Sequence, residues 1–88
     1  MEGLKKLRNE IDKIDEEIVK LLAKRSKIAM KIAKYKKEHG LQIYDARRER
    51  EVIEKVKKLA RNNGLDETLL EKVFQSIIIH TRESEKQI

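Results

Sequence analysis

Apolar residues recur along the first third of the chain in alternating steps of three and four. Such steps return to one face of an α-helix, so the pattern predicts a helix over about residues 4–38. Gly40 is expected to end it, after lysines that suit the negative end of a helix dipole. Nine of the ten positions in this series are apolar, and we call them the apolar seam: Leu4, Leu7, Ile11, Ile14, Ile18, Leu21, Ile28, Ile32 and Tyr35.

Two shorter helices are predicted to follow. Each is preceded by an aspartate that can cap a helix N-terminus, Asp45 in one case and Asp66 in the other. The loop "HGLQIY" leads to the first of them and "RNNG" at 61–64 ends it. The apolar face of the second helix is Val52, Ile53, Val56, Leu59 and Ala60, and that of the third is Leu69, Leu70, Val73, Phe74, Ile77 and Ile78. We therefore expect a single all-α domain, residues 1–88, with three helices.

The length of the first helix predicts a partner. At 1.5 Å per residue it is about 50 Å long, whereas a compact chain of this size has a diameter of about 30 Å. The helix must therefore project while its apolar seam runs nearly end to end. A second copy is the simplest cover, so we predict an intertwined homodimer with the first helices side by side. The alternative is a helical hairpin with a frayed end.

Composition narrows the class of protein. The 88 residues include no proline, cysteine or tryptophan and only three aromatic side chains, which disfavours β-rich and disulfide-stapled folds. No apolar run approaches the ~18 residues of a membrane span, and we expect a cytoplasmic protein without a membrane partner. Charged residues make up 43% of the chain and the net charge is +6, which favours an anionic partner.

One position of the series holds a permanent cation, Arg25. Lys36 lies eleven residues further on and faces nearly the same way. Arg8 lies 17 residues before Arg25, about 25 Å along the helix axis, which no small ligand bridges. An antiparallel partner helix could carry its own Arg8 past Arg25, so that both subunits would build one site.

Polar residues also interrupt the apolar faces of the other two helices. They are Arg48 and Glu49 after the cap Asp45, and Thr81 and Glu85 on the third helix. Every one of these polar residues also has a purely structural explanation. Arg25 could fix the register of a coiled coil, and Lys36 could be a solvated lysine. Asp45 could be a helix cap only, Arg48 and Glu49 an exposed ion pair, and Thr81 and Glu85 part of a fraying helix end. Taken together, cations and hydrogen-bonding groups on three helices predict a water-poor pocket for a small polyanion.

Several kinds of catalysis lack the residues they need. The chain has no cysteine and no glycine-rich phosphate loop, and His39 and His80 lack metal-ligand spacing. The three serines have no base at a readable spacing. We therefore expect no cofactor and no metal, and chemistry that depends on positioning and fixed charge.

The motifs match a known family. The order "LRNEIDKIDEEIVKLLAKRSKIAMKIAKYK", a loop, "DARRERE" and "LLEKVFQSIII" resembles the all-helical (AroQ-type) chorismate mutases over residues 4–87. The most specific elements are "LRNEIDKID", the "KR" before an apolar run, the lysine eleven residues past that arginine, and D-x-x-R-E. The resemblance implies an intertwined dimer of three-helix chains, with two sites that rearrange chorismate to prephenate in phenylalanine and tyrosine biosynthesis.

The resemblance also implies roles for the candidate residues. Arg8 of the partner chain and Arg25 would bind the two substrate carboxylates, and Thr81 would hydrogen-bond a carboxylate. Lys36 would contact the ether oxygen of the breaking C–O bond and a carboxylate. Asp45 and Glu49 would hold the ring hydroxyl with support from Arg48, and Ile32 would pack on the ring.

One site position departs from the common bacterial pattern. Glu85 stands where glutamine often donates to the ether oxygen, and a carboxyl group can donate only when it is protonated. We therefore expect activity that rises toward acid pH, or a raised pKa for Glu85 caused by burial and by nearby Glu49.

Two other functions compete with this interpretation. An isochorismate pyruvate lyase on the same scaffold would keep the cations but resembles D-x-x-R-E less well. A basic helical module that binds nucleic acid or a partner helix would explain the charge. It would not explain cations on an apolar seam, and the chain has no recognisable helix-turn-helix or aromatic platform.

Overall fold

The computed structural model describes residues 1–88 and contains three helices and no strand. They are α1 (Glu2–Glu38), α2 (Ala46–Asn62) and α3 (Glu67–Glu85). The all-α prediction is confirmed, and each predicted helix lies where the pattern placed it. The first begins two residues before Leu4, because nothing at Glu2 or Gly3 breaks the helix.

Local signals in the sequence set the helix ends. Asp45 accepts a hydrogen bond from the backbone N–H of Arg48 at 3.0 Å, and Asp66 accepts one from that of Thr68 at 2.9 Å. Gly40 and Gly64 adopt φ angles of 66° and 70°, each one residue after the C-cap of the preceding helix, His39 for α1 and Asn63 for α2. This left-handed conformation lets the chain reverse at each place, and glycine adopts it without the strain that a Cβ atom would bring.

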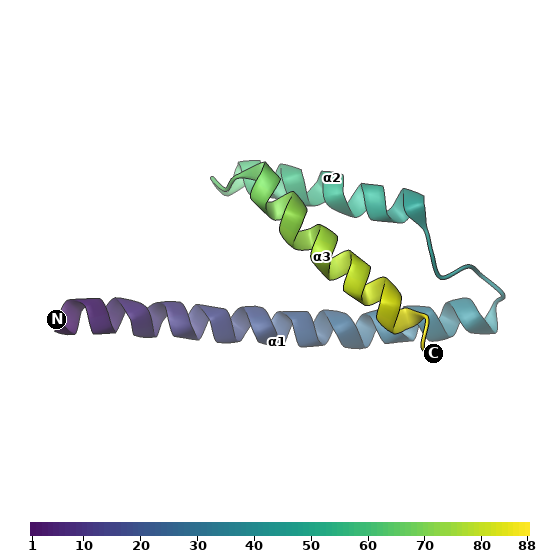
Figure 1. Cartoon of the computed structure of the whole chain (residues 1–88), viewed down its shortest axis with the longest axis horizontal. Helices are drawn as coiled ribbons and strands as arrows, with labels where there is room; N and C mark the ends of the chain where they lie inside the picture. The colour runs from purple at the N-terminus through teal and green to yellow at the C-terminus, as the bar shows by residue number, and fades with distance from the viewer.

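The helices form an elongated molecule. The α2–α3 hairpin lies over the C-terminal part of α1, and the N-terminal part of α1 projects beyond it (Figure 1). The molecule measures 57 × 24 × 16 Å, with a radius of gyration of 16.4 Å. A compact chain of this length would have a radius of gyration of about 12 Å. The projection predicted from helix length is therefore confirmed.

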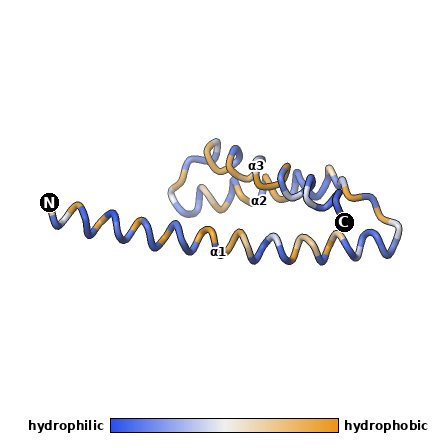
Figure 2. The backbone as a smooth tube through the Cα atoms, turned by 60° about the horizontal axis from the view of Figure 1, so that its bottom comes forward, coloured by the Kyte–Doolittle hydropathy of each residue, from blue (hydrophilic) through white to orange (hydrophobic).

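The core of the single chain is small. Only six residues are buried, and five of them are apolar: Ala29, Ala33, Val56, Ala60 and Ile78. Apolar and polar residues alternate along the whole of α1, including the part that projects (Figure 2). Every residue from 1 to 24 is exposed, so the apolar seam is uncovered over that length.

Some residues predicted to face inward are exposed in the single chain. Leu59, Leu69 and Val73 are 50%, 53% and 43% exposed, whereas Phe74 and Ile77 are partly buried. Within the single chain, α3 packs on both other helices, whereas α2 makes no close contact with α1. Separately, none of the three helices combines the length and the apolar character that crossing a membrane requires.

Candidate active site

The last turns of α3 cross α1 beside the cation of the apolar seam. Arg25 is half-buried and donates a hydrogen bond from Nη1 to Thr81 Oγ1 at 2.7 Å. The Thr81 hydroxyl donates in turn to the carbonyl oxygen of Ile77 at 2.8 Å. Because the hydroxyl proton is directed to Ile77, the lone pair of Thr81 is left for the guanidinium. The cation on the seam is thus held in place by α3.

A cavity of about 450 Å³ lies next to this contact and is lined by all three helices. It brings together six of the nine predicted site residues: Arg25, Ile32, Arg48, Glu49, Thr81 and Glu85. Apolar side chains, among them Ile28 and Val52, complete the lining. A mixed lining of this kind, with a few converging charges, suits a small polar ligand.

Glu85 is the one buried residue that is not apolar, at 9% exposed. Burial raises the pKa of its carboxyl group above the ordinary value, because a charged carboxylate loses hydration there. Lys36 and Arg25 act against this rise, in that order, and Glu49 adds to it by like-charge repulsion. The predicted upward shift and both of its predicted causes are therefore confirmed in direction.

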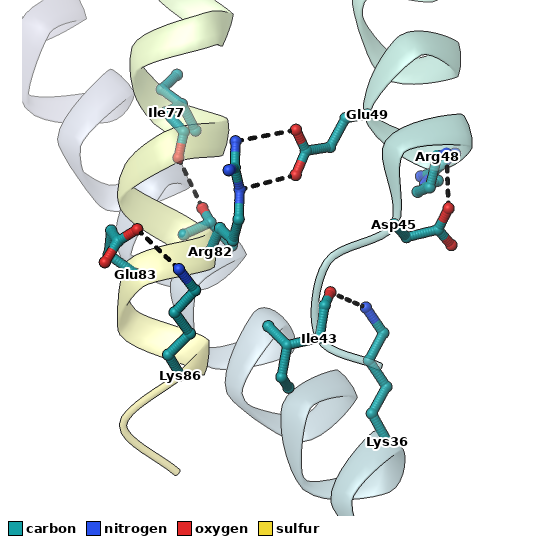
Figure 3. A network of polar contacts seen from close by, with 10 residues as sticks. Lys36, Ile43, Asp45, Arg48, Glu49, Ile77, Arg82, Glu83 and Lys86 are labelled. Atoms are coloured by element: carbon teal, nitrogen blue, oxygen red, sulfur yellow. Dashed lines mark hydrogen bonds and ion pairs between the residues drawn. The ribbon is translucent and has the colours of Figure 1, made fainter. Parts of the chain in front are cut away.

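Glu49 lies in the first turn of α2 and pairs with Arg82 of α3. Arg82 donates from Nη2 to Glu49 Oε1 at 3.2 Å, and its Nε lies 3.1 Å from Oε2 (Figure 3). Arg48 instead pairs weakly with Glu51, at 3.8 Å. Arg82 was not among the predicted site residues, since it falls in the polar end of the third helix that the pattern left unassigned.

Lys36 and Asp45 lie in a neighbouring hollow rather than in the cavity itself. The Lys36 ammonium donates to the carbonyl oxygen of Ile43 at 2.9 Å, so the loop before α2 holds it (Figure 3). Lys36 is nevertheless near enough to Glu85 to influence the pKa of that carboxyl. Its amine is therefore bonded to the loop and lies within electrostatic range of a residue that lines the cavity.

Arg8 lies apart from the other predicted residues. It is exposed on the projecting part of α1, and no residue before Leu21 lines the cavity. One chain thus supplies two cations close to the cavity through Arg25 and Lys36, with Arg48 on its wall. It also supplies a carboxyl group, that of Glu85, whose pKa is raised by burial. This arrangement can bind an anion and can donate a hydrogen bond, and it requires no nucleophile.

Comparison with known proteins identifies the family. The family model described as chorismate mutase type II matches residues 7–86. A chorismate mutase of Methanocaldococcus jannaschii is 36% identical over 87 residues, which cover 99% of this chain and 88% of that protein. A bifunctional chorismate mutase/prephenate dehydratase of Aquifex aeolicus is 40% identical over 91 residues, which cover all of this chain but 25% of that protein.

A third relative extends the range of the family. The T-protein of Haemophilus influenzae is 36% identical over 87 residues, covering 99% of this chain and 23% of that protein. The chain thus matches nearly the whole of one relative and about a quarter of the two others. The family model covers almost every residue of the three helices, and with it the cavity between them. The chain belongs to the chorismate mutase type II family.

Proposed function

We propose that the chain is an isomerase that rearranges chorismate to prephenate by a concerted [3,3] shift, in the synthesis of phenylalanine and tyrosine. The observation that carries this proposal is the cavity that gathers Arg25, Glu49, Thr81 and Glu85 in a chain of this family. The substrate has two carboxylates and a ring hydroxyl, which such a set of cations and hydrogen-bonding groups can recognise.

Binding can promote this reaction because the free substrate is flexible. The rearrangement needs the side chain folded over the ring, and salt bridges to both carboxylates impose that conformer. Arg25 is suited to one of them, since its guanidinium is already fixed by Thr81. Ile32 would pack against the ring and Arg48 would support the hydroxyl end of the site, both from the cavity wall.

The site would also stabilise the negative charge that develops in the transition state. The C–O bond breaks ahead of C–C bond formation, so negative charge grows on the ether oxygen. Lys36 and protonated Glu85 would both donate to that oxygen, and they would interact more strongly with the transition state than with the substrate. Glu49 and Asp45 would hold the ring hydroxyl. The raised pKa of Glu85 supports its share of this role.

The proposed enzyme is a homodimer with two shared sites. The exposed apolar seam on residues 4–21 supports this assembly, because a second α1 running antiparallel would cover it. The partner's copy of Arg8 would then reach the cavity and bind the second carboxylate. A cytoplasmic location remains a prediction from the sequence.

The direct test is to follow chorismate loss and prephenate formation with the purified chain. We expect turnover by the wild type, and a loss of about a hundredfold or more in kcat/KM for Arg25→Ala, because a fixed charge at the reacting substrate is removed. Absence of chorismate turnover in the wild type would refute the proposal. Pyruvate release from isochorismate would instead support the lyase, and salt-sensitive DNA binding without turnover would support the nucleic-acid module.

Complementation tests the shared site. Arg8→Ala and Arg25→Ala should each be nearly inactive, but an equal mixture that exchanges subunits should recover about a quarter of the wild-type sites. In a mixed dimer, one site keeps both arginines and the other lacks both. A mixture of Arg25→Ala with Lys36→Ala is the control, since both residues belong to one chain's half of the site. Recovery in the control, or none in the first mixture, would contradict the shared site.

A further inference from the structure

Arg82 connects three parts of the chain at the edge of the cavity. It follows Thr81 on α3, and successive residues of a helix point about 100° apart. Thr81 therefore faces α1, where it accepts from Arg25, while Arg82 faces α2, where it meets Glu49. The last turn of α3 thus holds a cation of α1 with one side chain and an acid of α2 with the next.

The pair between Arg82 and Glu49 is partly shielded from water. Their side chains are 28% and 25% exposed, whereas those of the exposed pair Lys20–Glu16 are 73% and 64% exposed. One hydrogen bond is aligned, and the buried Nε adds an ionic contact without a hydrogen bond of its own. Shielding of this degree makes the attraction between the charges stronger than at a solvated surface.

A second contact fixes the guanidinium from its face. Its central carbon lies 4.7 Å from the centre of the Tyr44 ring, in cation–π geometry. Tyr44 directly precedes Asp45, the cap of α2. The Arg82 side chain is therefore held at its face by the loop and at its edge by Glu49, which restricts the positions that the Glu49 carboxylate can take.

Glu49 is the residue through which this arrangement reaches the site. It lines the 450 Å³ cavity and also a second cavity of about 770 Å³ on whose wall Arg82 and Tyr44 lie. A carboxylate offers about four acceptor sites, so two contacts to Arg82 leave others for a ligand in the first cavity. Without Arg82, the carboxylate would be free to rotate and its charge would be unpaired.

We propose that Arg82 is a positioning residue for the proposed mutase reaction: it holds the Glu49 carboxylate at the cavity wall and balances its charge, so that Glu49 accepts from the ring hydroxyl. This inference rests on the proposed function. Arg82 does not line the 450 Å³ cavity, so it would act through Glu49, which does.

The surrounding charges define what the loss of Arg82 should change. Glu85 faces Lys36 and Arg25 from α1 and Glu49 from α2, and these three groups act on its pKa directly. Arg48 adds a cation on the cavity wall. Removing Arg82 would leave the negative charge of Glu49 uncompensated, which would increase its repulsion of an ionised Glu85.

The test is a double-mutant cycle with Arg82→Met, which keeps the apolar stem, and Glu49→Gln, which keeps the side-chain shape; both remove the charge. We expect Arg82→Met to lower kcat/KM about tenfold, since a hydrogen bond to a charged group is lost. In the Glu49→Gln background the same change should cost less than about twofold, because the two residues act as one unit. Arg82→Lys should recover part of the loss. If Arg82→Met lowers kcat/KM as much in the Glu49→Gln background as in the wild type, the inference is overturned.

A matched control separates positioning from stability. Arg61 also joins α2 to α3, through a hydrogen bond to Glu67 at 2.6 Å, but at the far end of the hairpin. Arg61→Met removes a similar bridge and should leave kcat/KM unchanged. If both variants lower activity in proportion to their stability, Arg82 has only a structural role.

The titration of Glu85 provides a readout independent of turnover. Followed by carboxyl ¹³C NMR, its midpoint should move to higher pH in Arg82→Met, less in the double variant, and not in Arg61→Met. An unmoved midpoint in Arg82→Met would overturn the inference even if the wild type is an active mutase. If the wild type lacks chorismate turnover, the proposed function fails, and this titration still decides whether Arg82 controls Glu49.

Discussion

The two halves of α1 carry the same apolar pattern but differ in what surrounds them. In the first half, Leu7, Ile11 and Ile14 are 60%, 56% and 52% exposed, and no other helix covers them. In the second half, the flanking Ala29 and Ala33 are buried and Arg25 is bonded to α3, although the seam residues Ile28 and Ile32 are still 50% and 47% exposed. A helical period specifies which face is apolar, but it does not specify whether the cover comes from the same chain or from another copy.

The same difference separates the complete and incomplete parts of the candidate site. The second half of α1 supplies the residues that line the cavity with α2 and α3, and the first half supplies Arg8, which is exposed and does not line it. If a second copy covers the first half of α1, it would bury the exposed apolar seam and also bring its own Arg8 to the cavity.

The largest effect is expected from a charge on the uncovered seam. Ile14→Glu should convert the proposed dimer to a monomer, because an antiparallel partner would bury the new carboxylate in an apolar contact. Loss of the partner's Arg8 should then lower kcat/KM about a hundredfold or more. Light scattering after size exclusion and the chorismate assay measure the two effects.

A control for this variant lies one residue away. Lys13→Glu introduces the same side chain about 100° round the helix from Ile14 and off the apolar seam, where it should remain in solvent. It should leave both the assembly and the turnover unchanged. A monomeric wild type with full activity would show that the first half of α1 has no role in the site.

An intermediate effect is expected from a change in the protonation of Glu85, which lines the cavity beside the second half of α1. Its folded-state pKa is raised, so the protonated form that donates a hydrogen bond is present at low pH and is lost as pH rises through that pKa. Wild-type kcat/KM should fall by about tenfold for each pH unit above it. Glu85→Gln should flatten the profile, because an amide donates at every pH.

The Glu85→Ala variant completes this test, since it can donate at no pH and should be weakly active throughout. The stability contribution of Glu85 follows the same direction: it is present below the ordinary pKa of the group and is lost above the raised one. Activity that is constant from about pH 4 to 9 and survives Glu85→Ala would rule out this role, because a titrating donor must change its protonation there.

The smallest effect is expected outside both halves of α1. Asp66→Ala removes the cap of α3 and should lower the free energy of unfolding by about 1 kcal/mol, with kcat/KM unchanged. Asp45→Ala removes the equivalent cap of α2 and should also lower kcat/KM, because Asp45 is proposed to bind the ring hydroxyl. Urea unfolding and the chorismate assay compare them. Equal activity of the two variants would argue against a binding role for Asp45.

Much of the fold could be read from the sequence because its determinants are local. The period of three and four, the capping aspartates at 45 and 66, and the glycines at 40 and 64 each act within a few residues. The meeting of Arg25 with Thr81 could also be anticipated, since both interrupt an apolar face that must be packed.

Other contacts depend on how the helices cross, which a periodic pattern does not encode. The pairing of Glu49 with Arg82 joins residues 33 positions apart, and Arg82 lies among polar residues that look solvated in sequence. The capture of Lys36 by the Ile43 carbonyl depends on the path of the loop. A signal for Arg82 did exist: it lies four residues after Ile78, on the face that packs toward α2.

The small residues at the crossing of α1 and α3 have a consequence for the dimensions of the site. Ala33 has no exposed surface and Ala29 lies between cavities that α3 also lines. Because each side chain is a single methyl group, the two helix backbones can come close together there. A bulkier residue at either place would act as a wedge, drawing Thr81 away from Arg25 and widening the space for a ligand, although neither alanine carries any chemistry.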